Sequence, residues 1–220
     1  MRTFSVRSIN ECLLGYVSNG TKFHDTSIFF AAYVNEENPM IDQLLREALN
    51  TRIVNRFLGY QSKAKGAVDK QVYALWNILQ KRKFRYSSVS NTSLSSNVVF
   101  SQRVRTFDDA LESSQINCVD GSVLFASLLR AINIDPILVR TPGHMFVGYY
   151  TDNSHTDKNL LETTMIGDVD LDDFGTFGEG VRVQGHAVAE AGAHGDDQVG
   201  LIDGLVGSVA AVHAQQAEVM

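Results

Sequence analysis

The stretch NCVDGSVLFASLLRAI, residues 117–132, decides the fold and places a cysteine at the start of a helix. Asn117 is a residue type that favours the N-cap, and Asp120 adds negative charge to the first turn. Gly121 and Ser122 keep this turn narrow, so we expect another element to approach it closely. One helical face is apolar, with the spacing of a helix packed on a core: Leu124, Phe125, Leu128, Leu129 and Ile132.

Cys118 follows the predicted N-cap directly, at the positive end of the helix dipole. This setting stabilises a thiolate and is one of the few that make a cysteine reactive near neutral pH. A lone cysteine is more often an inert part of a hydrophobic core. The position of Cys118 alone therefore leaves both interpretations open.

A histidine and a carboxylate follow on short strands. A hairpin centred near Asn153 would place His144 opposite Glu162, and a slip of two residues would place them diagonally but still within reach. Together with Cys118 they would form a nucleophile, a base and a group that orients the base. Aromatic and β-branched residues, separated by a turn at 141–143 and a polar loop at 151–159, predict strands at 137–140, 144–150 and 160–164.

The runs NCVDGSVLFASLLRAINIDPILVRTPGHMFVGYY and LLETT resemble the core of the transglutaminase-like cysteine peptidase superfamily, especially its bacterial branch. The resemblance is strongest over residues 103–164. It implies an α+β, papain-like fold in which a catalytic helix packs on a small antiparallel sheet. It also implies that Cys118 is the nucleophile, His144 the base and Glu162 the third member. The better-known members usually have aspartate as the third member, and the aromatic residue that often follows the histidine is here shifted to Phe146.

We therefore expect cysteine-dependent acyl chemistry on peptide or isopeptide amide bonds, through a thioester intermediate. Hydrolysis is favoured over amine transfer because the resemblance is to bacterial members. The backbone N–H of Cys118 would help to hold the oxyanion. Gln115 is a candidate donor to the same oxyanion, or else a solvent-facing loop residue, and Asn117 and Asp120 are candidates for supporting the site.

Two other interpretations compete with this one. The chain could be a non-catalytic protein-interaction module that retains the transglutaminase-like fold. Alternatively, Cys118, His144 and Glu162 have acceptable ligand types for a metal site. On the favoured interpretation the partner is a protein or peptide substrate, and neither a metal nor an organic cofactor is required.

The residues before this core predict an N-terminal segment, 1–55, and a core, 56–167. Strands are predicted at 11–17 and 26–34 around the hairpin-turn dipeptide Asn19-Gly20, followed by a helix from about residue 39 to 49. A further helix is predicted at 66–82. On it Trp76, the single tryptophan, is predicted to anchor the core against the Cys118 helix.

Charge is unevenly distributed along the 220 residues, whose net charge is −6. Residues 168–220 carry ten acids and one base, and this acidic, Gly- and Ala-rich tail is predicted to be weakly ordered. Its three histidines lack metal-ligand spacing. No dense Lys/Arg stripe predicts a nucleic-acid partner.

No run of 18 apolar residues predicts a membrane span, and no signal peptide is visible. Cytoplasmic localisation is thus the default expectation, unless the chain is a fragment of a larger secreted protein. Two cysteines are too few for a disulfide scaffold. Cys12 lies in a predicted strand and is expected to be an inert core thiol, although a Cys12–Cys118 disulfide would block the nucleophile.

Overall fold

The computed structural model describes residues 4, 6–88, 96–141 and 143–167. The predictions for the tail, 168–220, lie outside these residues. The helices and strands follow in this order: β1 (Glu11–Ser18), β2 (Lys22–Asp25), the 3₁₀ helix η1 (Ser27–Tyr33), α1 (Pro39–Asn50), α2 (Ala67–Lys81), β3 (Arg85–Tyr86), β4 (Val99–Arg103), α3 (Phe107–Ser113), β5 (Gln115–Ile116), α4 (Cys118–Ala131), β6 (Pro136–Thr141), β7 (His144–Tyr150), β8 (Lys158–Leu161) and the 3₁₀ helix η2 (Thr163–Met165).

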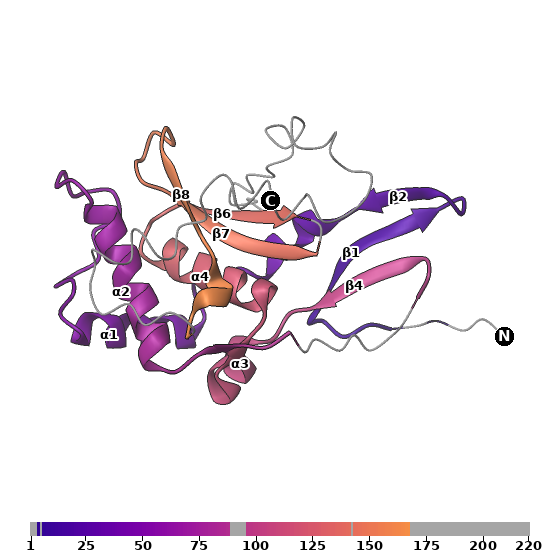
Figure 1. The fold of residues 1–220 in the computed structure, drawn as a ribbon, viewed down its shortest axis with the longest axis horizontal. Coiled ribbons are helices and arrows are strands. Elements are labelled where there is room, and N and C mark those ends of the chain that lie inside the picture. Colours follow the sequence, from indigo (N-terminus) through magenta and orange to yellow (C-terminus); the bar gives the residue numbers. More distant parts are fainter. Residues whose placement is uncertain (1–3, 5, 89–95, 142, 168–220) are drawn as a thin grey trace, which may run out of the picture.

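The fold is α+β, with small antiparallel sheets that flank a central helix. One sheet has the strand order β2-β1-β4 and another the order β6-β7-β8, while β3 and β5 form a short parallel pair. Figure 1 shows α1 and α2 on one side of α4 and the β2-β1-β4 sheet on the other. Helix α4 packs most extensively on β7 and then on β6. Within the described residues, no helix has the length and apolar content needed to cross a membrane.

The hydrophobic core lies around α4 and α2. Trp76 of α2 is fully buried, and its ring lies 6.2 Å from that of Phe125 of α4. The prediction that Trp76 anchors the core against the Cys118 helix is thus confirmed. Cys12, Phe30 and Ile41 belong to the same cluster of buried side chains, so the N-terminal elements complete the core that surrounds α4.

Residues 26–34 do not form the predicted strand. The turn at Asn19 and Gly20, both with positive φ, is tight enough that Ser18 pairs with Lys22, and the return strand β2 is already over at Asp25. There the Asp25 side chain accepts a hydrogen bond from the Ser27 N–H, which turns the chain into η1. This local hydrogen bond competes with the strand that the Asn19-Gly20 hairpin turn predicts for residues 26–34.

The β7–β8 hairpin is also centred one residue later than predicted. Val147 pairs with Leu161 and Gly148 with Leu160, so His144 and Glu162 are related diagonally and not directly. Strand β8 ends at Leu161, which places Glu162 just beyond the strand and not within it. The reason is local: the Glu162 side chain accepts a hydrogen bond from the Thr164 N–H and caps η2, which bends the chain away from the sheet.

Candidate active site

The start of α4 is fixed by a reciprocal cap. The Asn117 side-chain oxygen accepts a hydrogen bond from the Asp120 N–H at 2.8 Å, and the Asn117 N–H donates to Asp120 Oδ2 at 3.0 Å. The backbone N–H groups of Asn117 and Asp120 would otherwise be buried without partners, and this capping box gives each of them an acceptor. The predicted N-cap is confirmed, and Cys118 is the first residue of the helix.

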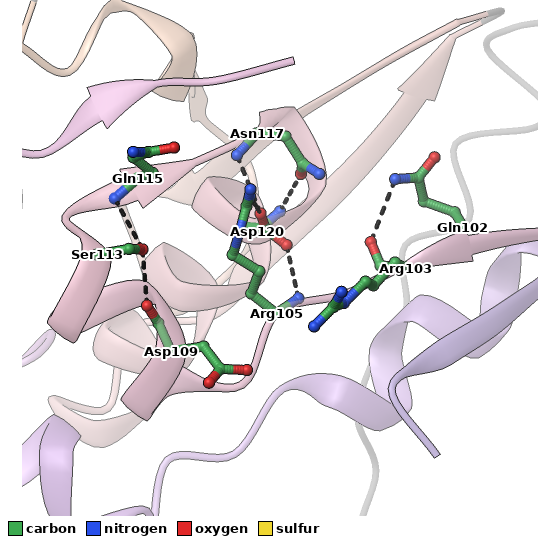
Figure 2. Close-up of polar contacts among 8 residues, drawn as sticks. All are labelled: Gln102, Arg103, Arg105, Asp109, Ser113, Gln115, Asn117 and Asp120. Atoms are coloured by element: carbon green, nitrogen blue, oxygen red, sulfur yellow. Dashed lines mark hydrogen bonds and ion pairs between the residues drawn. The ribbon is translucent and has the colours of Figure 1, made fainter. Parts of the chain in front are cut away.

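Arg105 locks this cap from outside the helix. Its Nη1 lies 2.5 Å from Asp120 Oδ2, and its backbone N–H donates to Asp120 Oδ1 at 2.8 Å (Figure 2). The Asp120 side chain is almost completely buried, whereas that of Arg105 is 18% exposed. Because both oxygens of Asp120 are engaged, Asp120 and Asn117 hold the helix start in place and leave Cys118 to face the site.

The first turn of α4 is narrow, as predicted, and η2 packs against it. A Cβ atom at Gly121 would lie only 2.9 Å from Oγ1 and 3.0 Å from Cβ of Thr163. Real Cβ atoms hardly approach so closely, so glycine permits this contact. Thr163 follows Glu162 directly, and the close packing therefore brings the carboxylate towards the helix start.

His144 lies between Cys118 and Glu162. Its Nε2 is 2.7 Å from Glu162 Oε2, while Glu162 Oε1 accepts hydrogen bonds from the Thr164 N–H at 3.1 Å and from Thr164 Oγ1 at 2.7 Å. Because Nε2 faces Glu162, Nδ1 is the ring nitrogen left for the Cys118 thiol. Glu162 thus occupies the place of an orienting carboxylate. Thr164, which has no signal in the sequence, holds it through two hydrogen bonds.

The electrostatics of His144 and Glu162 favour their charged forms. The hydrogen bond with Cys118, then that with Glu162, raises the pKa of His144 to about 10, although burial opposes the shift. Burial would raise the pKa of Glu162, but the bonds from His144 and Thr164 outweigh it and lower the pKa. An imidazolium beside a carboxylate is the expected state at neutral pH.

Cys118 and His144 line a common cavity of about 100 Å³. Its wall combines residues of α4 and of both antiparallel sheets: Leu14, Phe30, Gln102, Cys118, Val119, Arg140, Gly143, His144 and Met145. Besides Cys118 and His144, the members with polar or charged side chains are Gln102 and Arg140. Neither residue has a signal in the sequence. Gln102, for example, reaches the site only through the pairing of β4 with β1.

Gln115 lies elsewhere than expected for an oxyanion donor. It is an exposed residue of β5 whose backbone N–H donates to Ser113 Oγ (Figure 2). It does not line the cavity that contains Cys118 and His144. Gln102 does line the cavity, and its Nε2 donates to the Arg103 carbonyl at 3.2 Å. A carboxamide near Cys118 is thus supplied by β4, and the role assigned to Gln115 remains a prediction.

Tyr86 also lies within the electrostatic reach of the site. Partial burial, followed by the negative charges of Cys118 and Glu162, raises the pKa of its hydroxyl. It belongs to β3, where it pairs with Ile116 of β5 just before α4 begins. This tyrosine was missed because a two-residue strand leaves no periodic signal in the sequence.

The second cysteine provides a contrast within the same chain. Cys12 is buried, and burial raises the pKa of its thiol to about 12. Both cysteines are free thiols in the structure, and Cys118 is the more accessible. Cys12 therefore has the environment of the inert core thiol that was predicted.

The arrangement can move a proton between a thiol and an imidazole and can hold the imidazolium that results. In the described part of the chain, no group of three His, Cys, Asp or Glu side chains is arranged to hold a metal ion.

Comparisons with protein-family models, with curated proteins and with solved structures gave no significant match to this chain.

Proposed function

We propose that the chain is a cysteine hydrolase that cleaves peptide or isopeptide amide bonds, as its resemblance to transglutaminase-like, papain-like cysteine peptidases implies. The observation that carries the proposal is the position of His144, with Glu162 on Nε2 and Cys118 on its other side. A helix-start thiol, an imidazole and an anchored carboxylate are the three parts that nucleophilic catalysis requires.

In the proposed reaction, His144 holds the proton of Cys118 as an imidazolium, and the thiolate attacks the amide carbonyl. The backbone N–H groups at the helix start that the capping box does not engage, including that of Cys118, hold the oxyanion. His144 then gives the proton to the leaving amine, the C–N bond breaks, and a thioester remains on Cys118.

Water completes the reaction. His144 accepts a proton from water as its oxygen attacks the thioester, the C–S bond breaks, and the proton returns to the Cys118 sulfur as the carboxylic acid leaves. Glu162 keeps the ring oriented and stabilises the imidazolium in each step. An amine in place of water would give transfer. We favour hydrolysis on the resemblance to bacterial members.

Alkylation by iodoacetamide at pH 6 tests the proposal, with the modification of each cysteine followed by peptide mass spectrometry. Cys118 should react much faster than Cys12, because Cys118 is the more accessible thiol and lies beside His144, whereas burial raises the pKa of the Cys12 thiol. His144→Ala should slow the alkylation of Cys118 by about tenfold or more. Cys118→Ala, which should fold normally, should lose both the rapid phase and any hydrolysis.

Equal, slow alkylation of Cys118 in the wild type and in His144→Ala would contradict the catalytic proposal. It would favour the second candidate, a non-catalytic interaction module. One observation supports that candidate: the β2-β1-β4 sheet exposes aromatic side chains, among them Phe23 (49% exposed) and Phe100 (38%), whose rings lie 6.0 Å apart. Exposed apolar side chains that gather on one face are a common feature of interaction surfaces.

A further inference from the structure

Arg140 places a positive charge in the wall of the Cys118 cavity. It lies near the end of β6, opposite Met145 of β7, and both residues line the cavity. The neighbouring wall is largely apolar, with Leu14, Phe30 and Val119. A guanidinium among apolar side chains interacts with a ligand charge more strongly than one surrounded by water.

Asp25 of the other sheet holds this guanidinium from behind. Arg140 Nη1 donates to Asp25 Oδ2 at 2.7 Å, while Asp25 does not line the cavity and its side chain is 49% exposed. Burial of Asp25 opposes ionisation, but hydrogen bonds from Ser27 and the Arg140 charge outweigh it and lower the pKa of the carboxyl. The anchor is therefore charged at neutral pH and fixes where Arg140 points.

The anchor engages Arg140 through one nitrogen. Elsewhere in the chain, Arg82 donates to Glu47 through both Nε and Nη2, at 2.7 and 2.5 Å, which is a closed two-point pair. A guanidinium has five N–H donors in a planar fork that matches a carboxylate. Within the described residues, the single bond to Asp25 thus leaves an edge of the Arg140 fork for a second carboxylate, and Arg140 itself is a wall residue of the cavity.

We propose that Arg140 is a specificity residue that selects substrates with a carboxylate beside the scissile amide. The inference rests on the proposed function of Cys118, since it identifies the substrate class of the same cavity. The carboxylate can be an acidic side chain or the terminal carboxylate of a peptide. Both present the same planar group to the fork.

Thiol-directed probes of matched size test the proposal. N-iodoacetyl-glutamate amide and N-iodoacetyl-glutamine amide differ only in the side-chain charge, and N-iodoacetyl-glutamine with a free terminus moves the charge to the end. In each reaction the Cys118 sulfur displaces iodide. Alkylation rates are measured in the wild type, in Arg140→Gln and Arg140→Lys, and in Arg130→Gln, which removes a guanidinium at the far end of α4.

At least one charged probe should alkylate the wild type about three- to tenfold faster than the neutral probe, as expected for a partly exposed charge-assisted pair. The probe that gains identifies the source of the carboxylate. Arg140→Gln should bring the ratio close to one, Arg140→Lys should retain part of it, and Arg130→Gln should leave it unchanged.

A ratio that is the same in Arg140→Gln as in the wild type would overturn the role of Arg140, even if Cys118 reacts rapidly. A ratio near one in the wild type would overturn it as well. Failure of the proposed function is a separate result: slow alkylation by the neutral probe that does not depend on His144. A ratio that still depends on Arg140 in that case would identify a carboxylate-binding cavity without catalysis.

Discussion

His144 Nε2 lies 2.7 Å from Glu162 Oε2, although the two residues are not opposite each other in the β7–β8 ladder. The contact exists because Glu162 has left the strand and begins the turn of η2, where Thr164 binds its other oxygen. The imidazole is therefore oriented by a carboxylate whose own direction is set by a turn. Changes in that turn should therefore alter the orientation of the His144 ring.

Glu162→Gln keeps the shape of the side chain and removes its charge. We expect turnover and Cys118 alkylation to fall by about tenfold or more, while the free energy of unfolding changes by at most about 1 kcal/mol. The His144 ring should also titrate at a lower pH than in the wild type, because one of the causes of its raised pKa is lost. An NMR titration of the ring protons measures this, and an unchanged midpoint would remove Glu162 from the mechanism.

The raised pKa of His144 predicts how stability depends on pH. The folded state binds the proton with a pKa of about 10, against 6.5 for an ordinary histidine. The stabilisation is therefore complete below the lower value and is lost as the pH rises from 6.5 to 10. Denaturant unfolding of the wild type and of His144→Gln should give a stability difference that shrinks over this range. A difference that is constant or grows with pH would contradict the assignment.

Gly121→Ala should damage the site through packing alone. The added methyl would lie within 3.0 Å of Thr163, so η2 and the neighbouring Glu162 must move away from α4. We expect a loss of about 1–3 kcal/mol in unfolding free energy, as for overpacked cores. Alkylation of Cys118 should slow in parallel.

Thr163→Ala provides the matched control for this prediction, because it removes the hydroxyl that the new methyl would meet. The double variant should recover part of both the stability and the alkylation rate. Additive losses in the double variant would show that the two positions do not compete for the same space.

The Arg105–Asp120 pair should contribute far more to stability than an ordinary surface pair. The Asp120 side chain is 1% exposed, so Asp120→Ala breaks the capping box and leaves Arg105 partly buried without this partner. We expect a loss of about 3 kcal/mol or more. Glu36→Ala, which breaks the half-exposed pair with Arg130, should cost at most about 1 kcal/mol. Chemical denaturation measures both, and equal losses would contradict the burial argument.

The start of α4 was predictable from the sequence because its determinants are local. Asn117 and Asp120 lie three residues apart, and the apolar stripe of the helix repeats with the helical period. The proximity of His144 and Glu162 was also predictable, since a hairpin joins them. The end of the second strand was not, because the Glu162 side chain itself ends it by capping η2.

The wall of the cavity lay beyond sequence-based reasoning. Gln102 reaches the cavity because it pairs with Cys12, a residue far from it in sequence. This pair lies next to an irregularity between Leu13 and Gly15 that shifts the register. Such a pairing has no local signature, and a one-residue shift turns every following side chain to the other face. For this reason the sequence gives no signal for Gln102, whereas Gln115 is a candidate only because it is near Cys118 in sequence.

The same long-range pairing has a consequence for the order in which the full chain refolds. The segment that carries Cys118, His144 and Glu162 closes through short connections. The β1–β4 ladder, by contrast, joins residues as far apart in sequence as Glu11 and Arg103. Closing a longer loop costs more entropy, so the local unit should form first. A thiol with its imidazole would then be assembled before the wall that limits access to it, and pulsed hydrogen exchange should find α4 and β7 protected earlier than β1.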